Sequence, residues 1–250
     1  MNVLILAAGY ATRLYPLTLN KAKPLLVVGG KPIIEWLVDN LRGIPDLETI
    51  YVVTNDKFAA DFQAWSQSYQ KRDPKFKFKV VNDGSTSDDD KLGAIGDINF
   101  VVTRENISHT SLLVAAGDNL FTNSLADFVA NARNTEVTVA VYDVGDTEAI
   151  KKYGNVAVDA EGIITRFEEK PQNPQGTLAA IALYYYSPKV LSLLKTYLAA
   201  GNNADQPGRF VQWLYTRKPV RTFQMKGQWL DIGSKETLEN ADKILASHVN

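Results

Sequence analysis

The sequence predicts an α/β fold with a doubly wound, mostly parallel mixed sheet of the Rossmann-like kind. Strand and helix patterns alternate from residue 2 to residue 142, which is typical of parallel strands joined by crossover helices. The first strand, 2–8, is an unbroken apolar run that ends at Gly9, as expected of a strand covered on both faces. After Gly154 the pattern changes to short strands, which indicates a smaller β-rich subdomain laid against the same sheet.

Residue spacing defines the elements that follow the first strand. Pro32 is placed to open a helix that Gly43 closes. The apolar face of this helix consists of Ile34, Leu37, Val38 and Leu41. A strand is predicted over 49–54, after which Asp56 can cap the next helix. The aromatic face of that helix has the spacing of a core face and consists of Phe58, Phe62, Trp65 and Tyr69.

The middle of the chain continues this alternation. Lysines alternate with apolar residues from 75 to 80, which predicts a half-exposed strand at a sheet edge. The polar, acidic segment 82–90 is too long for a simple turn, and we expect a mobile functional loop there. Beyond it the pattern predicts a helix over 92–102, a strand over 111–116, a helix over 125–133 and a strand over 136–142.

The remaining residues predict short strands followed by helices. The strands are expected over 155–158, 163–168, 179–186 and 220–225, and the helices over 188–199, 208–217 and from Ser234 onward. No linker rich in Pro, Gly or Ser separates these segments from the rest, so we expect residues 1–250 to form a single domain.

Bulk composition excludes several classes of protein. The 250 residues, 45% of them hydrophobic, can bury one substantial core. A net charge of −1 gives no reason to expect a nucleic acid or an anionic membrane as partner. The chain has no cysteine for disulfides and no apolar run near the ~18 residues of a membrane span. We therefore expect a cytoplasmic protein.

The loop after the first strand suits a polyphosphate. Gly9 lets the main chain approach a ligand closely, and the side chains that follow are a hydroxyl, a guanidinium and two ammonium groups, from Thr12, Arg13, Lys21 and Lys23. Backbone N–H groups and cations of these kinds bind phosphate oxygens. A glycine after a strand is also often only a tight turn, and basic loop residues are often just solvated. The loop does not match the dinucleotide fingerprint, which opens a helix at once.

Two aspartates could hold a metal. Asp118 follows the predicted strand 111–116, and Asp231 lies near the end of the chain. Ligands of open α/β sheets lie at the carboxyl ends of the strands, and Mg²⁺ is usually held by one or two carboxylates, waters and substrate phosphates. We therefore predict Mg²⁺ as cofactor, although Asp118 taken alone is more commonly a turn or helix cap.

One long block of residues resembles the signature of a known family. It comprises Leu6-Ala-Ala-Gly9-x-x-Thr12-Arg13-Leu14-x-Pro16-x-Thr18, then Lys23-Pro24-Leu25-Leu26 and Lys31-Pro32-Ile33-Ile34. This block is similar to that of the sugar-1-phosphate nucleotidylyltransferases, also called nucleotide-sugar pyrophosphorylases. The likeness extends along nearly the whole chain, through Ala116-Gly117-Asp118-Asn119 and Trp229-Leu230-Asp231-Ile232-Gly233.

The resemblance implies roles for individual residues. For the nucleotide it implies Leu6, Ala8, Gly9, Thr12, Arg13, Lys23, Asn82 and Gly93. For the sugar phosphate it implies Asp118, Tyr153, Gly154, Glu169, Lys170, Ala180 and Tyr184. Asp118 and Asp231 would hold the metal, and Arg13, Lys23 and Lys170 would act in catalysis. The single domain would then comprise a nucleotide-binding half, 1–150, and a sugar-phosphate-binding half, 151–250.

The implied reaction joins a nucleoside triphosphate to a sugar 1-phosphate, most simply a hexose 1-phosphate with dTTP or UTP, and releases pyrophosphate. The attacking phosphate is already an anion, because the second pKa of a phosphate monoester is about 6, so no general base is needed. This agrees with the two histidines, His109 and His248, which we expect at the surface. Mg²⁺, Arg and Lys would neutralise charge on the leaving group.

Three positions depart from the family pattern. Ala11 stands where a second glycine is common, which predicts a stiffer loop. Asn82 stands where thymidylyl and uridylyl enzymes commonly have glutamine, and Ala182 stands where glycine is common. Neither the base nor the sugar is therefore fixed by the sequence.

Other interpretations stay open. A glycosyltransferase of related architecture typically carries Asp-x-Asp, which Asp118-Asn119-Leu120 lacks. A non-catalytic regulatory relative would have lost charged site residues, all of which are present here. Cytidylyl or guanylyl transfer to another sugar phosphate or to phosphocholine is a further alternative. Because the chain stops soon after its final helix, we expect no C-terminal β-helix and no second activity, and a homo-oligomer is compatible with the sequence.

Overall fold

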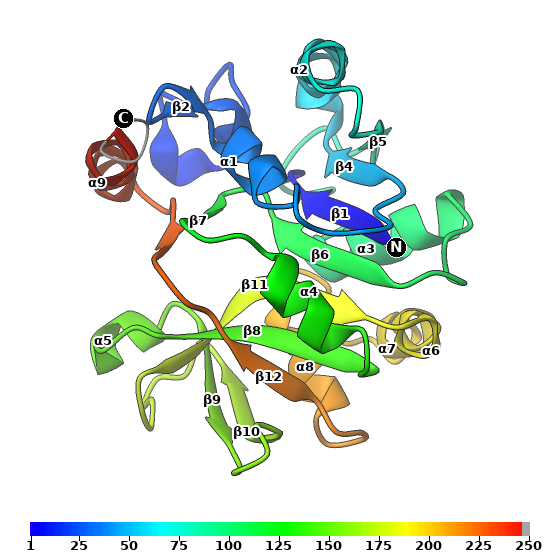
Figure 1. The fold of residues 1–250 in the computed structure, drawn as a ribbon, viewed down its shortest axis with the longest axis vertical. Helices are drawn as coiled ribbons and strands as arrows, with labels where there is room; N and C mark the ends of the chain where they lie inside the picture. Colours follow the sequence, from blue (N-terminus) through cyan, green and yellow to red (C-terminus); the bar gives the residue numbers. More distant parts are fainter. Residues whose placement is uncertain (247–250) are drawn as a thin grey trace. The chain divides into compact units, whose positions relative to one another are not determined.

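The computed structural model describes residues 1–246, which form two compact units (Figure 1). Unit 1 consists of Met1–Lys91, Ala115–Ala126 and the chain from Gly227 onward, and unit 2 consists of Leu92–Val114 and Asp127–Lys226. Each unit is assembled from separate stretches, so neither coincides with the halves 1–150 and 151–250. That the chain works as one domain stays a prediction, and His248 lies outside the described residues.

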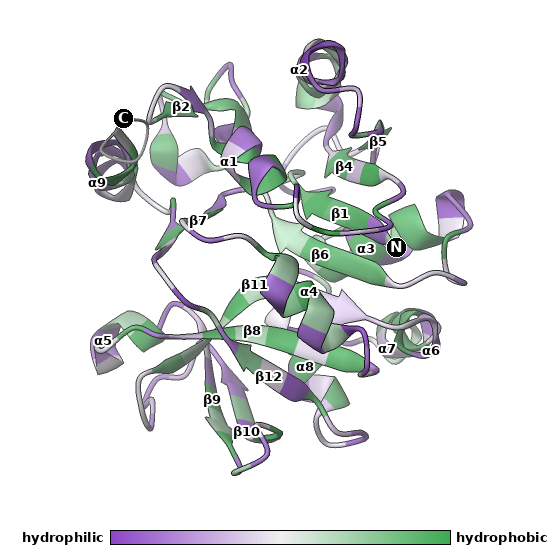
Figure 2. Ribbon diagram, in the orientation of Figure 1, coloured by the Kyte–Doolittle hydropathy of each residue, from purple (hydrophilic) through white to green (hydrophobic). Residues whose placement is uncertain are grey.

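Unit 1 is built on parallel strands. β1 (Asn2–Leu6) pairs with β4 (Ile50–Thr54), with Val3 opposite Ile50, and β4 pairs with β5 (Phe78–Asn82). The side chains of β4 are all buried and those of β1 nearly so, and Figure 2 shows both strands as hydrophobic. β5 is an edge strand, as predicted, but it begins at Phe78. The α/β class and the parallel arrangement of the first strands are confirmed.

Short elements surround these strands in unit 1. The helical ones are η1 (Thr12–Leu14), η2 (Lys23–Leu25), α1 (Ile33–Asp39), η3 (Asp56–Phe58), α2 (Ala59–Arg72) and α9 (Lys235–Ala246). Two small antiparallel ladders join β2 (Val27–Val28) to β3 (Lys31–Pro32) and β7 (Asn119–Phe121) to β13 (Trp229–Asp231). β6 (Leu112–Ala116) gives its last two residues, Ala115 and Ala116, to unit 1.

The predicted helix cap at Asp56 is wrong. Asn55 is the capping residue, because its Oδ1 accepts a hydrogen bond of 3.2 Å from the Phe58 backbone N–H, and Asp56 already belongs to η3. The amide nitrogen of the same fully buried Asn55 donates to the Ala8 carbonyl at 2.9 Å. A single side chain therefore starts the helical turn and also fixes the backbone just beyond β1.

The aromatic face of α2 lies in the core, as predicted. Phe58 and Phe62 at its start are 2% and 0% exposed, and Tyr69 is 3% exposed. Trp65 packs edge-on against Phe78 of β5, with ring centroids 5.2 Å apart. Among the described residues, no helix has the length and the apolar character that crossing a membrane requires.

Unit 2 contains the β-rich part of the chain. Its strands pair in the order β10 (Ile164–Glu169), β9 (Gly154–Val158), β11 (Leu178–Tyr186), β8 (Val137–Asp143) and β12 (Arg221–Gln224). Its helices are α3 (Ala94–Arg104), α4 (Ala126–Ala132), α5 (Thr147–Ile150), α6 (Pro188–Leu191), α7 (Leu193–Ala199) and α8 (Gly208–Leu214). β11 and β12 pair directly with β8, whereas β9 pairs with β10 and β11. The helix predicted over 188–199 is divided at Ser192.

Candidate functional site

The loop that follows β1 is held from both sides. The Ala8 carbonyl accepts the Asn55 amide, and the fully buried Thr18 hydroxyl donates to the Ala11 carbonyl at 2.8 Å. Leu14 anchors the middle of the loop in a small core whose other buried members are Leu26, Val28, Ile33, Leu120, Ile232, Ala241 and Leu245. These anchors leave Thr12 and Arg13 exposed.

A pocket of about 300 Å³ lies over this loop. It is lined by Gly9, Tyr10, Ala11, Thr12, Arg13, Leu14, Lys23, Asp88, Lys91 and Gly233. Four of the predicted nucleotide-binding residues are among them, and within the described part of the chain Arg13 makes no ion pair. The pocket is therefore polar and carries a cation that is available to a ligand.

Ala11 takes a backbone conformation that disfavours a side chain. Its φ and ψ are 49° and 42°, in the left-handed region. Lys170 also has a positive φ, of 49°, and the other non-glycine residues with positive φ in the described chain are an aspartate and an asparagine, which tolerate it better. The strain thus falls in the two segments that the sequence assigned to phosphates, as is common at functional sites.

The two predicted metal ligands lie together in unit 1. The β7–β13 ladder pairs Asn119 with Asp231, and Asp118 directly precedes Asn119. The Asn119 amide nitrogen donates to Asp118 Oδ1 at 2.9 Å and to Asp231 Oδ1 at 3.5 Å. Lys23 Nζ donates to Asp118 Oδ2 at 2.5 Å and to the Ile232 carbonyl at 2.9 Å. Lys23, which also lines the pocket, is therefore paired with Asp118.

Asn119 and Trp229 form a support for these carboxylates that the sequence analysis did not assign. The Trp229 indole N–H donates to Asn119 Oδ1 at 2.7 Å, and both residues are buried. Because the indole occupies the amide oxygen, the amide nitrogen must face the two aspartates. Asn119 and Trp229 both lie in motifs that the sequence analysis quoted. Those motifs did not indicate that the two side chains, 110 positions apart, are hydrogen-bonded.

The aspartate pair fits Mg²⁺. Two carboxylate oxygens are oriented toward one amide, and no cluster of three or more His, Cys, Asp or Glu able to hold a metal occurs in the described residues. A site with two carboxylates and no further protein ligand suits Mg²⁺, which keeps several waters and takes substrate phosphates. Lys23 balances part of the negative charge of the pair.

Asn82 and Gly93, both predicted to bind the nucleotide, fall in different units. Asn82 lies in unit 1, and its amide is already engaged, donating to Asp56 Oδ1 at 2.7 Å and accepting from the Gly84 N–H at 2.8 Å. Gly93 lies in unit 2 with φ of 77°, and a Cβ there would be 2.6 Å from the Ala204 carbonyl oxygen. At the end of β1, the Leu6 carbonyl accepts the Gly117 N–H at 2.9 Å.

The remaining sugar-phosphate candidates lie side by side in unit 2. The β9–β10 ladder pairs Gly154 with Glu169, and the β9–β11 ladder pairs Gly154 with Ala180. The Lys170 N–H donates to the Tyr153 carbonyl at 2.9 Å. Asp118 is the exception, because it lies in unit 1 with the nucleotide-binding candidates.

Glu169 is the half-buried acid of this group. Burial raises the pKa of its carboxyl group, and the nearby Lys170 and Arg209 oppose that shift. No described residue donates a hydrogen bond to this carboxylate. Tyr184 is buried, and burial together with the Glu169 charge raises the pKa of the Tyr184 hydroxyl.

Gly208 makes room for that carboxylate. A Cβ at Gly208 would lie 2.0 Å from Glu169 Oε2, and one at Gly154 would lie 3.1 Å from it. The sequence analysis placed Gly208 only at a helix start and did not connect it with the site. Nothing in its local sequence indicates a partner on a distant strand.

The family comparison decides which class of protein this is. The model of the family described as nucleotidyl transferase matches residues 2–248. The chain belongs to this family. The resemblance noted in the sequence is thereby confirmed at the level of the family.

Individual relatives are distant but cover the chain. The bifunctional protein GlmU of Methanocaldococcus jannaschii is 27% identical over 250 residues, which are 100% of this chain and 55% of the relative. A glucose-1-phosphate thymidylyltransferase of Neisseria gonorrhoeae is 28% identical over 258 residues, which cover 100% of this chain and 84% of the relative. The chain thus spans about half the length of the GlmU relatives.

The fold is shared with solved structures. A UDP-glucose pyrophosphorylase complexed with UDP-glucose superposes with a TM-score of 0.81 at 22% identity, covering 99% of this chain and 98% of that one. At this identity the similarity shows only that the two chains share a fold, the α/β fold of the nucleotidyl transferases.

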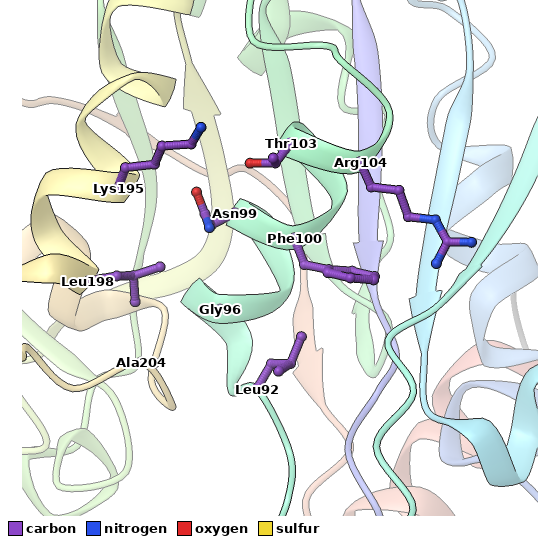
Figure 3. Close-up of a pocket in the computed structure, with 9 residues that line it drawn as sticks. All are labelled: Leu92, Gly96, Asn99, Phe100, Thr103, Arg104, Lys195, Leu198 and Ala204. Atoms are coloured by element: carbon purple, nitrogen blue, oxygen red, sulfur yellow. The ribbon is translucent and has the colours of Figure 1, made fainter.

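A second, larger pocket of unit 2 contains none of the predicted site residues. It has a volume of about 650 Å³, and Figure 3 shows Lys195 and Leu198 of α7 facing Asn99 and Thr103 of α3. Its lining is mostly apolar, with Leu92 and Phe100 among its members. The larger pocket by volume is therefore not the one that the predicted site residues line.

The strain at Ala11 leads to a stability prediction. Replacing Ala11 by glycine should stabilise the protein by about 0.5–1 kcal/mol, because about 1–2 kcal/mol of left-handed strain is relieved while glycine costs about 0.5–1 kcal/mol of backbone entropy. Urea unfolding measures the change. As a control, Ala60→Gly in the exposed start of α2 should destabilise by about 0.5–1 kcal/mol, and a loss of stability in Ala11→Gly would contradict the strain assignment.

Proposed function

We propose that this chain transfers a nucleoside monophosphate from a nucleoside triphosphate to a sugar 1-phosphate, producing a nucleotide sugar and pyrophosphate. The observation that carries the proposal is the position of Lys23, which lines the pocket with Arg13 and also pairs with Asp118 beside Asp231. Cations for a triphosphate and carboxylates for its metal are thus adjacent. This is the donor set that nucleotidyl transfer requires.

The named relatives support the choice of substrates. Two of them are a glucose-1-phosphate thymidylyltransferase and a UDP-glucose pyrophosphorylase, which favours a hexose 1-phosphate with dTTP or UTP. Cytidylyl or guanylyl transfer, phosphocholine as acceptor, and a non-catalytic regulatory role are the alternatives. The engaged amide of Asn82 means that the base would be read by a side chain already held in place.

In the proposed reaction, a phosphate oxygen of the sugar 1-phosphate attacks the α-phosphorus of the triphosphate. The bond from that phosphorus to the bridging oxygen breaks, and pyrophosphate leaves with the electron pair. Bound Mg²⁺, held by Asp118 and Asp231, would supply charge stabilisation to the phosphates. Arg13 and Lys23 would neutralise charge on the leaving group, as expected of guanidinium and ammonium groups in a pocket of this kind.

The residues of unit 2 are proposed to hold the sugar phosphate. The half-buried Glu169 carboxylate would accept hydrogen bonds from sugar hydroxyls, and the strained Lys170 would bind the phosphate. Burial makes such hydrogen bonds stronger than they would be in water. No histidine or other general base is needed, because the attacking phosphate is ionised at neutral pH.

We also infer a cytoplasmic location, from the absence of cysteine, and no nucleic-acid partner, from the net charge of −1.

The direct test is a matrix of nucleoside triphosphates against sugar 1-phosphates with pyrophosphate release as readout. In the active combination, Arg13→Ala and Asp231→Ala should each lower kcat by about 10²–10³, because charge on the leaving group is no longer balanced. Circular dichroism should show an intact fold. Lys189→Ala removes an exposed cation (81% exposed) and should leave kcat unchanged; near-normal turnover in Arg13→Ala would reject the assigned role.

The Asn119–Trp229 support gives a second prediction. Trp229→Phe keeps an aromatic ring but removes the indole N–H, so the Asn119 amide can turn its oxygen toward the carboxylates. We expect the Mg²⁺ concentration for half-maximal turnover to rise at least about tenfold, as for other supports of metal ligands. Trp213→Phe, in the aromatic cluster of unit 2, is the control. An unchanged Mg²⁺ requirement in Trp229→Phe would show that the indole does not position the metal ligands.

The substitution Glu169→Gln tests separately how Glu169 affects the stability of the protein and its binding of the sugar phosphate. A raised folded-state pKa means that the native protein binds the Glu169 proton more tightly than the unfolded chain, so native stability falls as pH rises from 4.5 through that raised value. Glutamine lacks this titration, so Glu169→Gln should become progressively more stable than the parent over that pH range. Its KM for the sugar phosphate should rise about tenfold with the nucleotide KM unchanged. A variant that instead loses stability at every pH would assign Glu169 a structural role.

A further inference from the structure

One wall of the pocket over the first loop comes from a segment for which the sequence analysis assigned no phosphate ligand. Asp88 and Lys91 line this pocket together with Arg13 and Lys23. All four side chains belong to unit 1. The pocket lining therefore contains three cations and one carboxylate.

The segment that carries Lys91 is fastened to the first loop. The buried Tyr10 hydroxyl donates to the Ser85 carbonyl at 3.1 Å, and the Asp56 N–H donates to the same carbonyl at 3.0 Å. Asp83 Oδ1 accepts both the N–H and the hydroxyl of Ser85, each at 2.7 Å. Ser85 thus has a fixed position relative to Tyr10, whose neighbours in the chain are Gly9 and Ala11.

The rest of the segment is closed by Asp90. Its carboxylate accepts hydrogen bonds from the backbone N–H groups and the hydroxyls of Thr86 and Ser87, at distances from 2.8 to 3.2 Å. The backbone N–H groups of Thr86 and Ser87, with the hydroxyls, lower the pKa of Asp90 to about 2. The carboxylate is thus ionised at neutral pH and keeps the turn closed, and Lys91 follows directly after it.

Lys91 is paired with Asp88. Its Nζ lies 3.2 Å from Asp88 Oδ1, and the two side chains are 35% and 60% exposed. An ion pair this exposed is weak, whereas a triphosphate carries several negative charges that attract ammonium groups more strongly. A polyphosphate in the pocket can therefore take Lys91 from Asp88.

We propose that Lys91 is a third cationic ligand of the triphosphate, beside Arg13 and Lys23, and that Asp88 holds it in place and competes with the phosphates for it. The proposal rests on the function proposed above, because it supplies the same pocket with a further phosphate contact. The proposal gives the segment 83–91 a role in binding the phosphates.

Direct binding of inorganic tripolyphosphate tests this without requiring turnover. Isothermal titration calorimetry at one fixed salt concentration should show about tenfold weaker binding for Lys91→Ala, the loss expected for one charged hydrogen bond, and near-normal binding for Lys91→Arg. Lys71→Ala, an exposed lysine of α2, is the matched control and should bind as the parent does. Equal affinity of the parent and Lys91→Ala would overturn the proposal.

Asp88 gives a test of opposite sign. Asp88→Ala removes the competing anion, so tripolyphosphate should bind about two- to threefold more tightly. A merely structural role of the ion pair predicts instead that Asp88→Ala and Lys91→Ala weaken binding alike, and that result would overturn the proposal.

Steady-state kinetics connects the contact with the reaction. Lys91→Ala should raise the nucleoside triphosphate KM about tenfold, with kcat changed less than about twofold and the sugar 1-phosphate KM unchanged, as expected when a uniform binding contact is lost. If nucleotide sugar forms while Lys91→Ala shows parental KM and affinity, the Lys91 proposal alone fails. If the tripolyphosphate effects appear but no substrate pair reacts, the proposed function alone fails.

Discussion

The hydrogen-bonded ion pair between Lys23 and Asp118 is the interaction on which the arrangement in unit 1 depends. The ammonium group binds a carboxylate 95 residues away and a carbonyl 209 residues away in the sequence. It thereby joins the loop after β1, the end of β6 and the end of β13. The two side chains are 18% and 25% exposed, so removing either partner would leave a partly buried charge without compensation, which costs more than a surface pair.

This pair also balances charge beside the pocket of unit 1. Cations next to carboxylates are stabilised when opposite charges pair with one another. Lys23 balances Asp118, and Asp88 does the same for Lys91. Under the proposed function, a bound metal and polyphosphate would replace these internal partners with external ones of opposite charge.

The candidate ligand groups of the two units differ in their chemistry. In unit 1 the candidate ligands are charged groups and loop backbone, which suit phosphate. In unit 2 the central group is a carboxylate whose burial raises its pKa and which accepts no hydrogen bond from the described residues. Such an acceptor suits neutral hydroxyl groups, whose donors satisfy it without bringing in another charge. The charges that act on the Glu169 carboxylate are those of Lys170 and Arg209.

Sequence patterns predicted the features that depend on local chemistry. The buried runs of β1 and β4, the loop at Gly9 and the aromatic face of α2 follow from periodicity and from glycine geometry, and each occurs as expected. The positions of Asp118 and Asp231 after strand-like segments were also visible. Their proximity was not, because it depends on a ladder of only three residues on each strand.

Features that depend on distant partners escaped prediction. The capping role went to Asn55 and not Asp56 because the Asn55 amide can also reach the Ala8 carbonyl, a contact that no local pattern specifies. The orientation of Asn119 by Trp229 has the same origin. Ser192 divides the helix predicted over 188–199 although the apolar spacing continues across it, which shows that periodicity locates helical segments better than their breaks.

The absent side chain of Gly208 limits how this protein could diversify. The space that a methyl group would fill is occupied by an oxygen of Glu169, so any larger residue there forces the acid to a different position or a different rotamer. Residue 208 therefore controls the position of the Glu169 carboxylate, which belongs to another element. Among relatives that use other acceptor substrates, variation at residue 208 would be as informative as variation at residue 169.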